Sequence, residues 1–278
     1  MPDGVPAYEP LIRLSAFAGV FALVAVWELL APRRRQGVGR ARRWPGNLGL
    51  VVVDTLAVRL IFPMAAVGVA LVAEARGWGL LHQTGLPAWL EVPAAVVALD
   101  LATYGQHVAF HAVPWLWRLH RVHHADPEFD VTTGVRFHPV EVVLSIAVKA
   151  AVVVALGAPA LAVLVFEVLL NATSMFNHGN VRLPARWEPW LRRLVVTPDM
   201  HRVHHSILRR ETDSNYGFAL PWWDRLFGTY RAAPEAGHEG MTLGIGAFRD
   251  PAELRLDRLL LQPLRDDGRP RPARPKEA

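Results

Sequence analysis

This 278-residue chain contains two copies of one histidine pattern, LHRVHHADPE (119–128) and MHRVHHSILR (200–209). No other feature of the sequence says more about its fold and its chemistry. Each copy contains His-x-x-His-His, and together they hold six of the 12 histidines. On an α-helix, residues three and four positions apart share a face, so each copy presents three imidazoles side by side. Three imidazoles on one helix can serve more than one metal ion.

Three further histidines extend this pattern. YGQHVAFH (104–111) places two of them four residues apart, and FNHGN (176–180) contributes one more. The four groups together hold nine histidines, about twice what one ion can use, so a pair of metal ions with four or five ligands each fits the count. The predicted metal ligands are His107, His111, His120, His123, His124, His178, His201, His204 and His205.

The sequence contains no cysteine, which limits the kinds of metal site that the chain can form. Without cysteine there are no disulfides, thiolate zinc sites, cysteine-ligated iron–sulfur clusters or thiolate-bound haem. Any metal ion must then be held by histidine and carboxylate. A lone buried histidine is more often a hydrogen-bonded core residue than a ligand, but two copies of His-x-x-His-His are rare by chance.

Several polar residues near these groups are candidate supporting residues. Asp100 precedes His107 by seven residues on one helical stripe, where it can accept the outer N–H of a ligand imidazole or pair with an arginine. Asp199 can orient His201 or cap the helix that carries it. Weaker candidates are Asn177, Asn180 and Asn215.

Three histidines lie outside the four groups. His138, before a proline in RFHPVE, is a candidate tenth ligand or a residue of the site's surroundings. His82 and His238 are far from the groups in sequence, and we predict that both are surface residues.

The composition is typical of a membrane protein with basic loops: 52% of residues are apolar, the mean hydropathy is +0.20, and 30 Lys+Arg stand against 25 Asp+Glu. No pattern of a nucleic-acid-binding module is present. A spanning helix needs about 20 apolar residues. The apolar runs cover 14–31, 48–73, 90–110, 142–157 and 159–176, and the last two are short enough for a tight hairpin.

These runs predict an all-α, multi-pass helical bundle of about four to five apolar segments, with a helical cap that carries the dimetal site. Residues 32–47 contain six arginines and no acid, and basic loops favour the cytoplasm. Counting spans from there places every motif histidine on the cytoplasmic side, at the inner membrane if the source is bacterial. Lys149 and Glu167 are nearly equidistant from the turn at 157–159, so we predict that they pair; Asp54 and Arg59 receive no role.

We divide the chain into N-terminal membrane anchor helices (1–89), a catalytic domain (90–235) and a C-terminal extension (236–278). The extension is predicted to be disordered from about residue 262, where Pro, Arg and Asp accumulate without apolar periodicity. Two aromatic strings, WEPWL (187–191) and LPWWDRLFGTY (220–230), suit a membrane interface, although ordinary packing explains them equally well.

The motifs HVAFH (107–111), HRVHH (120–124), FNHGN (176–180) and HRVHH (201–205) resemble those of the fatty acid hydroxylase/sterol desaturase superfamily of integral-membrane di-iron enzymes. The resemblance covers about residues 95–230. It implies two iron ions, O2 as co-substrate, and hydroxylation or desaturation of a C–H bond of a lipid such as a sterol or fatty acyl chain. Zinc can replace iron at an all-imidazole site in recombinant protein.

The resemblance also bears on the partners. No glycine-rich flavin or nicotinamide fingerprint is present, so electrons must come from an external donor: a ferredoxin, a cytochrome b5-type protein or a reductase. The alternative is a membrane metal-binding or transport protein that uses the same histidines for zinc or another ion. Ligands dispersed across the bilayer would favour transport, whereas one cluster at one face favours catalysis.

Overall fold

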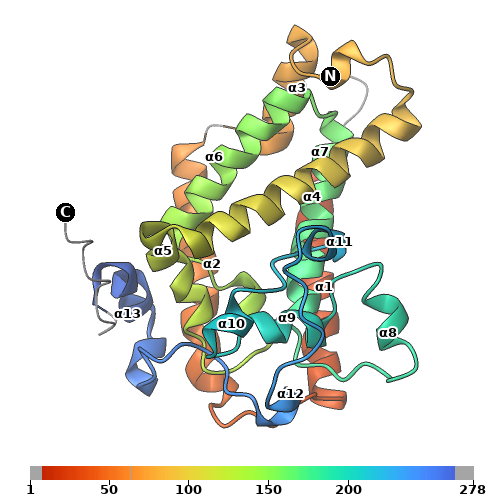
Figure 1. The fold of residues 1–278 in the computed structure, drawn as a ribbon. Helices are drawn as coiled ribbons and strands as arrows, with labels where there is room; N and C mark the ends of the chain where they lie inside the picture. Colours follow the sequence, from red (N-terminus) through yellow and green to blue (C-terminus); the bar gives the residue numbers. More distant parts are fainter. Residues whose placement is uncertain (1–7, 63, 267–278) are drawn as a thin grey trace, which may run out of the picture.

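The computed structural model describes residues 8–62 and 64–266, which form helices and turns with no β-strand among them. This confirms the all-α prediction. The long helices form the body of the molecule, and short helices gather near one end of it (Figure 1). The helices of eleven residues or more are α1 (Glu9–Leu30), α2 (Arg40–Ile61), α3 (Ala66–Arg76), α4 (Ala88–Ala112), α5 (Pro114–His124), α6 (Pro139–Leu156) and α7 (Ala160–Asn177). The shorter ones are α8 (Glu188–Leu191), α9 (Pro198–His204), α10 (Arg209–Thr212), α11 (Trp222–Leu226), α12 (Gly237–Gly240) and α13 (Leu256–Leu261).

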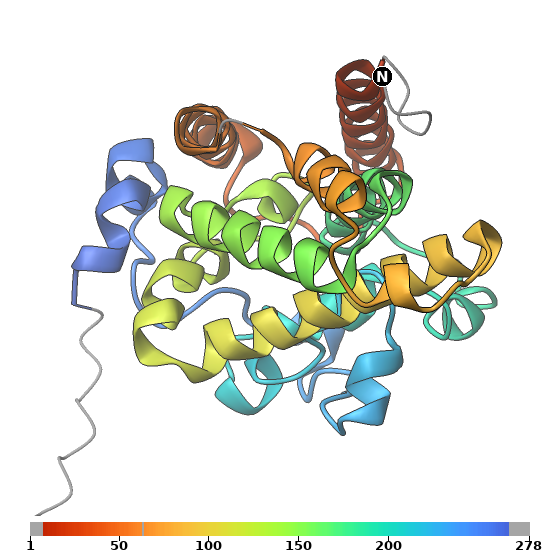
Figure 2. The ribbon, with the colours of Figure 1, turned by 90° about the horizontal axis from the view of Figure 1, so that it is seen from above.

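Four segments of the described chain are long and apolar enough to cross a membrane: Glu9–Leu30, Arg40–Gln83, Pro139–Leu156 and Ala160–Asn177. Helix α4, predicted as a span, is outside this set. It is long enough, but Glu91, Asp100 and its polar histidine-bearing half lower its hydropathy. Seen from above, α1 and α2 appear nearly end-on, whereas α4 and α6 are strongly inclined to them (Figure 2).

The second apolar run is two helices rather than the single one predicted. Helix α2 begins earlier, at Arg40, and ends at Ile61; α3 then begins at Ala66. Phe62 is extended, with φ −107° and ψ 112°. The sequence places proline at 63, and proline disfavours helical backbone in the residue before it.

The hairpin of α6 and α7 turns at Gly157, whose φ of 65° is a left-handed conformation that glycine adopts readily. The predicted pair is confirmed, since Lys149 Nζ lies 2.6 Å from Glu167 Oε1. Arg13 of α1 approaches the other oxygen of Glu167 at 3.0 Å. Two cations therefore neutralise one buried acid and join α1, α6 and α7.

The arginine-rich segment lies where α7 ends. Arg33 N donates to Asn180 O (2.9 Å), and Arg182 N donates to Ala31 O (2.9 Å). At the opposite end of the hairpin, Leu80 N donates to Ala155 O. Both findings agree with the order of spans predicted from charge.

One of the six arginines is not part of a solvated loop. Arg43 is fully buried in α2, where Nε lies 2.7 Å from Asp126 and Nη1 lies 2.6 Å from Asp130. Burial alone would raise the pKa of Asp126, but the Arg43 guanidinium lowers it to about 2. The counting of basic residues overlooked this structural ion pair.

The C-terminal extension was predicted to be disordered from about residue 262, but its ordered part extends beyond that residue. A 3₁₀ turn, η4 (Gln262–Leu264), packs against α5, and Arg118 Nε donates to Pro263 O at 2.6 Å. Residues 267–278 of the predicted disordered tail lie outside the described residues. The domain division remains a prediction, although α1 packs against α7 and α2 against α6.

The ion-pair group yields a test. Glu167→Gln leaves Lys149 and Arg13 without their shared acid and should lower stability by roughly 3 kcal/mol. Lys149→Met should cost less, because Arg13 still neutralises Glu167. Thermal unfolding in detergent, followed by tryptophan fluorescence, measures both. Equal losses would mean that the Arg13 contact contributes nothing.

Candidate metal centre

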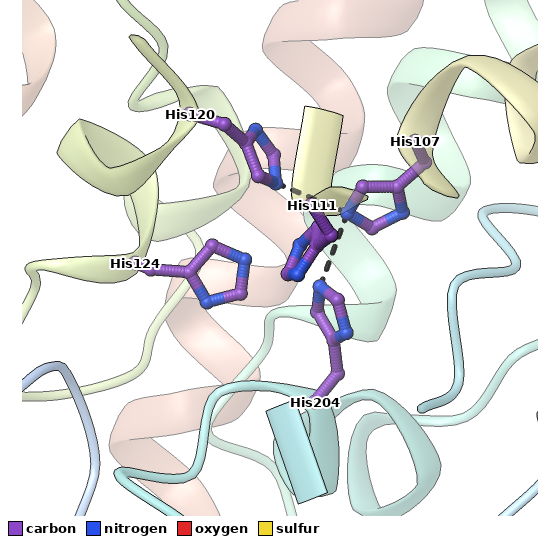
Figure 3. A group of neighbouring side chains, drawn as sticks. All are labelled: His107, His111, His120, His124 and His204. Atoms are coloured by element: carbon purple, nitrogen blue, oxygen red, sulfur yellow. Dashed lines mark hydrogen bonds between the residues drawn. The ribbon is translucent and has the colours of Figure 1, made fainter. Parts of the chain in front are cut away.

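The nine predicted ligands come together from four helices. Helix α4 carries two of them, α5 carries three, the end of α7 provides His178, and α9 with its cap provides three. Their ligand nitrogens form two groups, in each of which they lie within 4.8 Å of one another. The larger group is His107, His111, His120, His124 and His204 (Figure 3); the smaller is His123, His178, His201 and His205.

In the larger group, two backbone carbonyls fix the tautomers. His107 Nδ1 lies 2.7 Å from Tyr216 O, and His204 Nδ1 lies 2.7 Å from Ser214 O. Because a carbonyl only accepts, each Nδ1 donates, and each neutral ring carries a lone pair on Nε2. Burial and neighbouring histidines lower the pKa of both imidazoles, so both rings are neutral.

The two lone pairs face each other: Nε2 of His107 lies 3.0 Å from Nε2 of His204. Such a contact is repulsive unless a cation lies between the nitrogens. Both ring nitrogens of His111 and Nε2 of His124 are also buried without a hydrogen bond in the described chain. Buried polar atoms need a partner, and a metal ion supplies one. The larger group therefore fits a metal ion.

The smaller group repeats this arrangement around His178. Its Nδ1 lies 2.7 Å from Ser174 O, which leaves Nε2 as the lone pair. That Nε2 lies 3.1 Å from Nε2 of His123, 3.1 Å from that of His201 and 3.2 Å from that of His205. Burial lowers the pKa of His178 to about 3. Separations of this size suit ligands that share an ion at about 2.0–2.2 Å.

Two carboxylates lie against the larger group: Asp213 Oδ1 is 3.5 Å from His111 Nδ1, and Glu141 makes the closer contact. Glu141 Oε1 lies 2.6 Å from His120 Nδ1, and both side chains are buried. A carboxylate there fixes the tautomer and makes the opposite nitrogen a stronger ligand. Sequence reasoning missed Glu141. The acid follows the lone His138 in RFHPVE, but only the packing of α6 on α5 shows that it faces His120.

Residues 92–229 match the model of the fatty acid hydroxylase family, and this range contains all nine histidines. The chain belongs to the fatty acid hydroxylase/sterol desaturase superfamily. It is 27% identical over 227 residues to ornithine lipid hydroxylase OlsE of Rhizobium tropici, covering 78% of this chain and 66% of that protein. No solved structure matches.

Other superfamily relatives are similar over a smaller part of this chain. Human alkylglycerol monooxygenase is 26% identical over 171 residues, which cover 60% of this chain and 36% of that enzyme. Cholesterol 25-hydroxylase of Rattus norvegicus is 26% identical over 145 residues, which cover 51% of this chain and 47% of that enzyme. The chain therefore spans about two thirds, or less, of the length of these curated relatives.

Asp100 does not take either predicted role in this superfamily member. It accepts from Trp223 Nε1 (2.8 Å) and Leu220 N (3.2 Å), and it contacts neither a histidine nor an arginine of residues 8–62 and 64–266. Seven residues along a helix amount to about 10 Å, so a shared stripe does not bring Asp100 to His107. Its carboxylate instead anchors the segment leading into α11.

Asp199 also takes neither of its predicted roles, which were to orient His201 or to cap its helix. It pairs with Arg33 at 3.2 Å and with Arg202, and it contacts no ligand ring. The cap of α9 is Thr197, whose hydroxyl accepts from Met200 N. A threonine before proline is an ordinary helix start, so this signal was present in the sequence.

The three asparagines donate hydrogen bonds to backbone carbonyls and not to histidine side chains. Asn177 Nδ2 donates to Phe218 O, Asn180 Nδ2 donates to Arg34 O, and Asn215 Nδ2 donates to Met200 O. These contacts join the end of α7, the arginine-rich segment and α9 to neighbouring loops.

The remaining histidines lie outside both groups. His138 caps α6, accepting from Val140 N, and its Nε2 lies 3.1 Å from Leu260 O. His82 is exposed, as predicted. His238 is half-buried, 3.8 Å from Asp199, so its prediction as a surface residue was wrong.

The Glu141 contact predicts a specific loss. Glu141→Gln keeps an oxygen for the His120 N–H but removes the charge, and it should weaken metal binding by roughly 10- to 100-fold. Titration with a competing chelator measures this. Asp100→Asn is the matched control, because it removes a buried charge that contacts no histidine, and its metal affinity should be unchanged. Equal losses in both variants would contradict the role of Glu141.

Proposed function

We propose that this protein is an integral-membrane, non-haem di-iron oxygenase that hydroxylates a C–H bond of a lipid. The observation that carries the proposal is the convergence of nine buried imidazoles as two groups whose carbonyl-held tautomers direct lone pairs inward. Imidazole suits iron, and the relatives are named as lipid hydroxylases and monooxygenases. Those names favour hydroxylation over desaturation, which is the other reaction the superfamily resemblance implies.

Two iron ions at this site would supply the redox chemistry of O2. The balanced reaction consumes the lipid, O2, two electrons and two protons, and it yields the hydroxylated lipid and water. The chain's own residues hold the ligand rings neutral and aimed inward, and their burial keeps bulk water away. The two electrons require an external donor, which we propose to be a ferredoxin, a cytochrome b5-type protein or a reductase.

The membrane setting supports a lipid substrate. The histidines gather where α1 and α7 end, beside the arginine-rich segment, and do not thread through the four candidate spans. Within the spans, Glu167 pairs with Lys149 and Arg13, and Arg13 also pairs with Glu9 at 3.0 Å, so two cations face two acids. A site at one end of the bundle suits catalysis on a lipid better than ion transport. We propose that this end faces the cytoplasm, because basic segments favour that side.

Metal content tests the site. Protein purified in detergent from iron-replete cells should contain about two iron ions per chain. His204→Ala should lose metal, because it removes a nitrogen that meets His107 at 3.0 Å. His138→Ala is the matched control and should keep its metal. A single zinc ion, or metal unaffected by His204→Ala, would favour a metal-binding or transport protein. Two zinc ions call for repetition after iron reconstitution.

Activity is tested with isotopically labelled O2, a chemical or protein reductant, and lipids extracted from the host membrane. The expected product is a lipid that gains one labelled oxygen atom, and His204→Ala should form none. A product that loses two hydrogens without gaining oxygen would identify a desaturase. No lipid product from a chain that holds two irons and accepts electrons would contradict the proposal.

A further inference from the structure

Two short segments expose large apolar side chains on one part of the surface. Helix α8 and the turn after it expose Trp187, Trp190 and Leu194; helix α11 and its cap expose Trp222, Leu226 and Phe227. Each of these six residues, called here the aromatic face, is between 46% and 69% exposed. Exposed aromatic residues in such number mark an interaction surface.

The two segments are tied to each other. Trp222 Nε1 donates to Arg193 O at 2.9 Å, and Arg225 Nη2 donates to Arg192 O at 2.8 Å. Helix α11 is also fastened to the body of the protein, because Trp223 Nε1 donates to Asp100 of α4, which runs beside α11 in Figures 1 and 2. The aromatic face is thus a fixed surface rather than two loose loops.

Charge on this surface is positive. Arg186 lies over the ring of Trp187 at 5.4 Å, and Arg193 lies over that of Trp190 at 4.6 Å; both arginines are exposed. The acids nearby are already engaged. Glu188 pairs with Arg192 at 2.6 Å, and Asp224 is fully buried, accepting from backbone N–H groups.

We propose that the aromatic face rests in the headgroup layer of an anionic leaflet of the bilayer that the candidate spans cross. Tryptophan favours the depth of the headgroups, and arginine binds lipid phosphates while its stem stays with the apolar rings. The surface is continuous with a span, because Val181 pairs with Pro32 directly after α1 and leads into α8. This placement does not depend on the reaction proposed above.

Because the sequence contains no cysteine, single labels can be placed anywhere. Leu194→Cys labels the aromatic face. Glu239→Cys is the control, because its side chain is 69% exposed and α12 lies apart from α8 and α11 in Figure 1. The full chain, labelled with bimane, enters vesicles of phosphatidylcholine and phosphatidylglycerol that carry a headgroup nitroxide lipid. Quenching should be several-fold stronger at position 194 than at 239. Equal quenching, or cross-linking of two copies through position 194, would overturn the proposal.

A second variant tests the arginines. Arg186→Gln with Arg193→Gln, in the Leu194→Cys background, should abolish the extra quenching that phosphatidylglycerol produces over phosphatidylcholine alone. Circular dichroism and monodisperse elution establish that this variant is folded. If the parent shows no extra quenching with phosphatidylglycerol, the arginines do not bind anionic headgroups and that part of the proposal is wrong.

Discussion

The contact between Nε2 of His107 and Nε2 of His204 is the constraint on which the site depends. Both atoms carry lone pairs because backbone carbonyls occupy the opposite nitrogens, and 3.0 Å separates them. A neutral protein interior does not hold two lone pairs together without cause. The segment around Ser214 and Tyr216 is therefore as much a part of the centre as the histidines, since its carbonyls decide which nitrogen faces inward.

The buried network behind α5 explains how that helix keeps its position. Arg43 binds Asp126 and Asp130, and Asn47 bridges Asp126 and the guanidinium of Arg136, which donates to Val122 O at 2.8 Å. A buried ion pair adds little net stability, because desolvation offsets the attraction. Its effect here is positional, since it fixes α2 against the residues directly after His124.

Sequence reasoning succeeded where spacing alone determines geometry. The nine histidines lie together as predicted from their i, i+3 and i+4 spacing, while their role as metal ligands remains a proposal. The Lys149–Glu167 pair follows from equal distances to a turn. It failed where another element decides the contact. Asp100 shares a face with His107 but meets Trp223 instead, because periodicity does not reveal which segment packs opposite. Glu141 and the carbonyl acceptors depend on packing in the same way, and a backbone carbonyl has no residue-specific signature.

The same limit explains the errors in the membrane segments. Hydropathy measures only average composition, so it merged α2 with α3 across Pro63, and the counting of basic residues took Arg43 for part of a solvated basic loop. Both errors concern local chemistry, namely a missing amide proton and a buried ion pair. The predicted grouping of helix ends is not affected by them, because it depends on which end of each helix meets the basic segment. Arg33 and Asn180 lie together at the histidine end, whereas Leu80 and Ala155 lie together at the other.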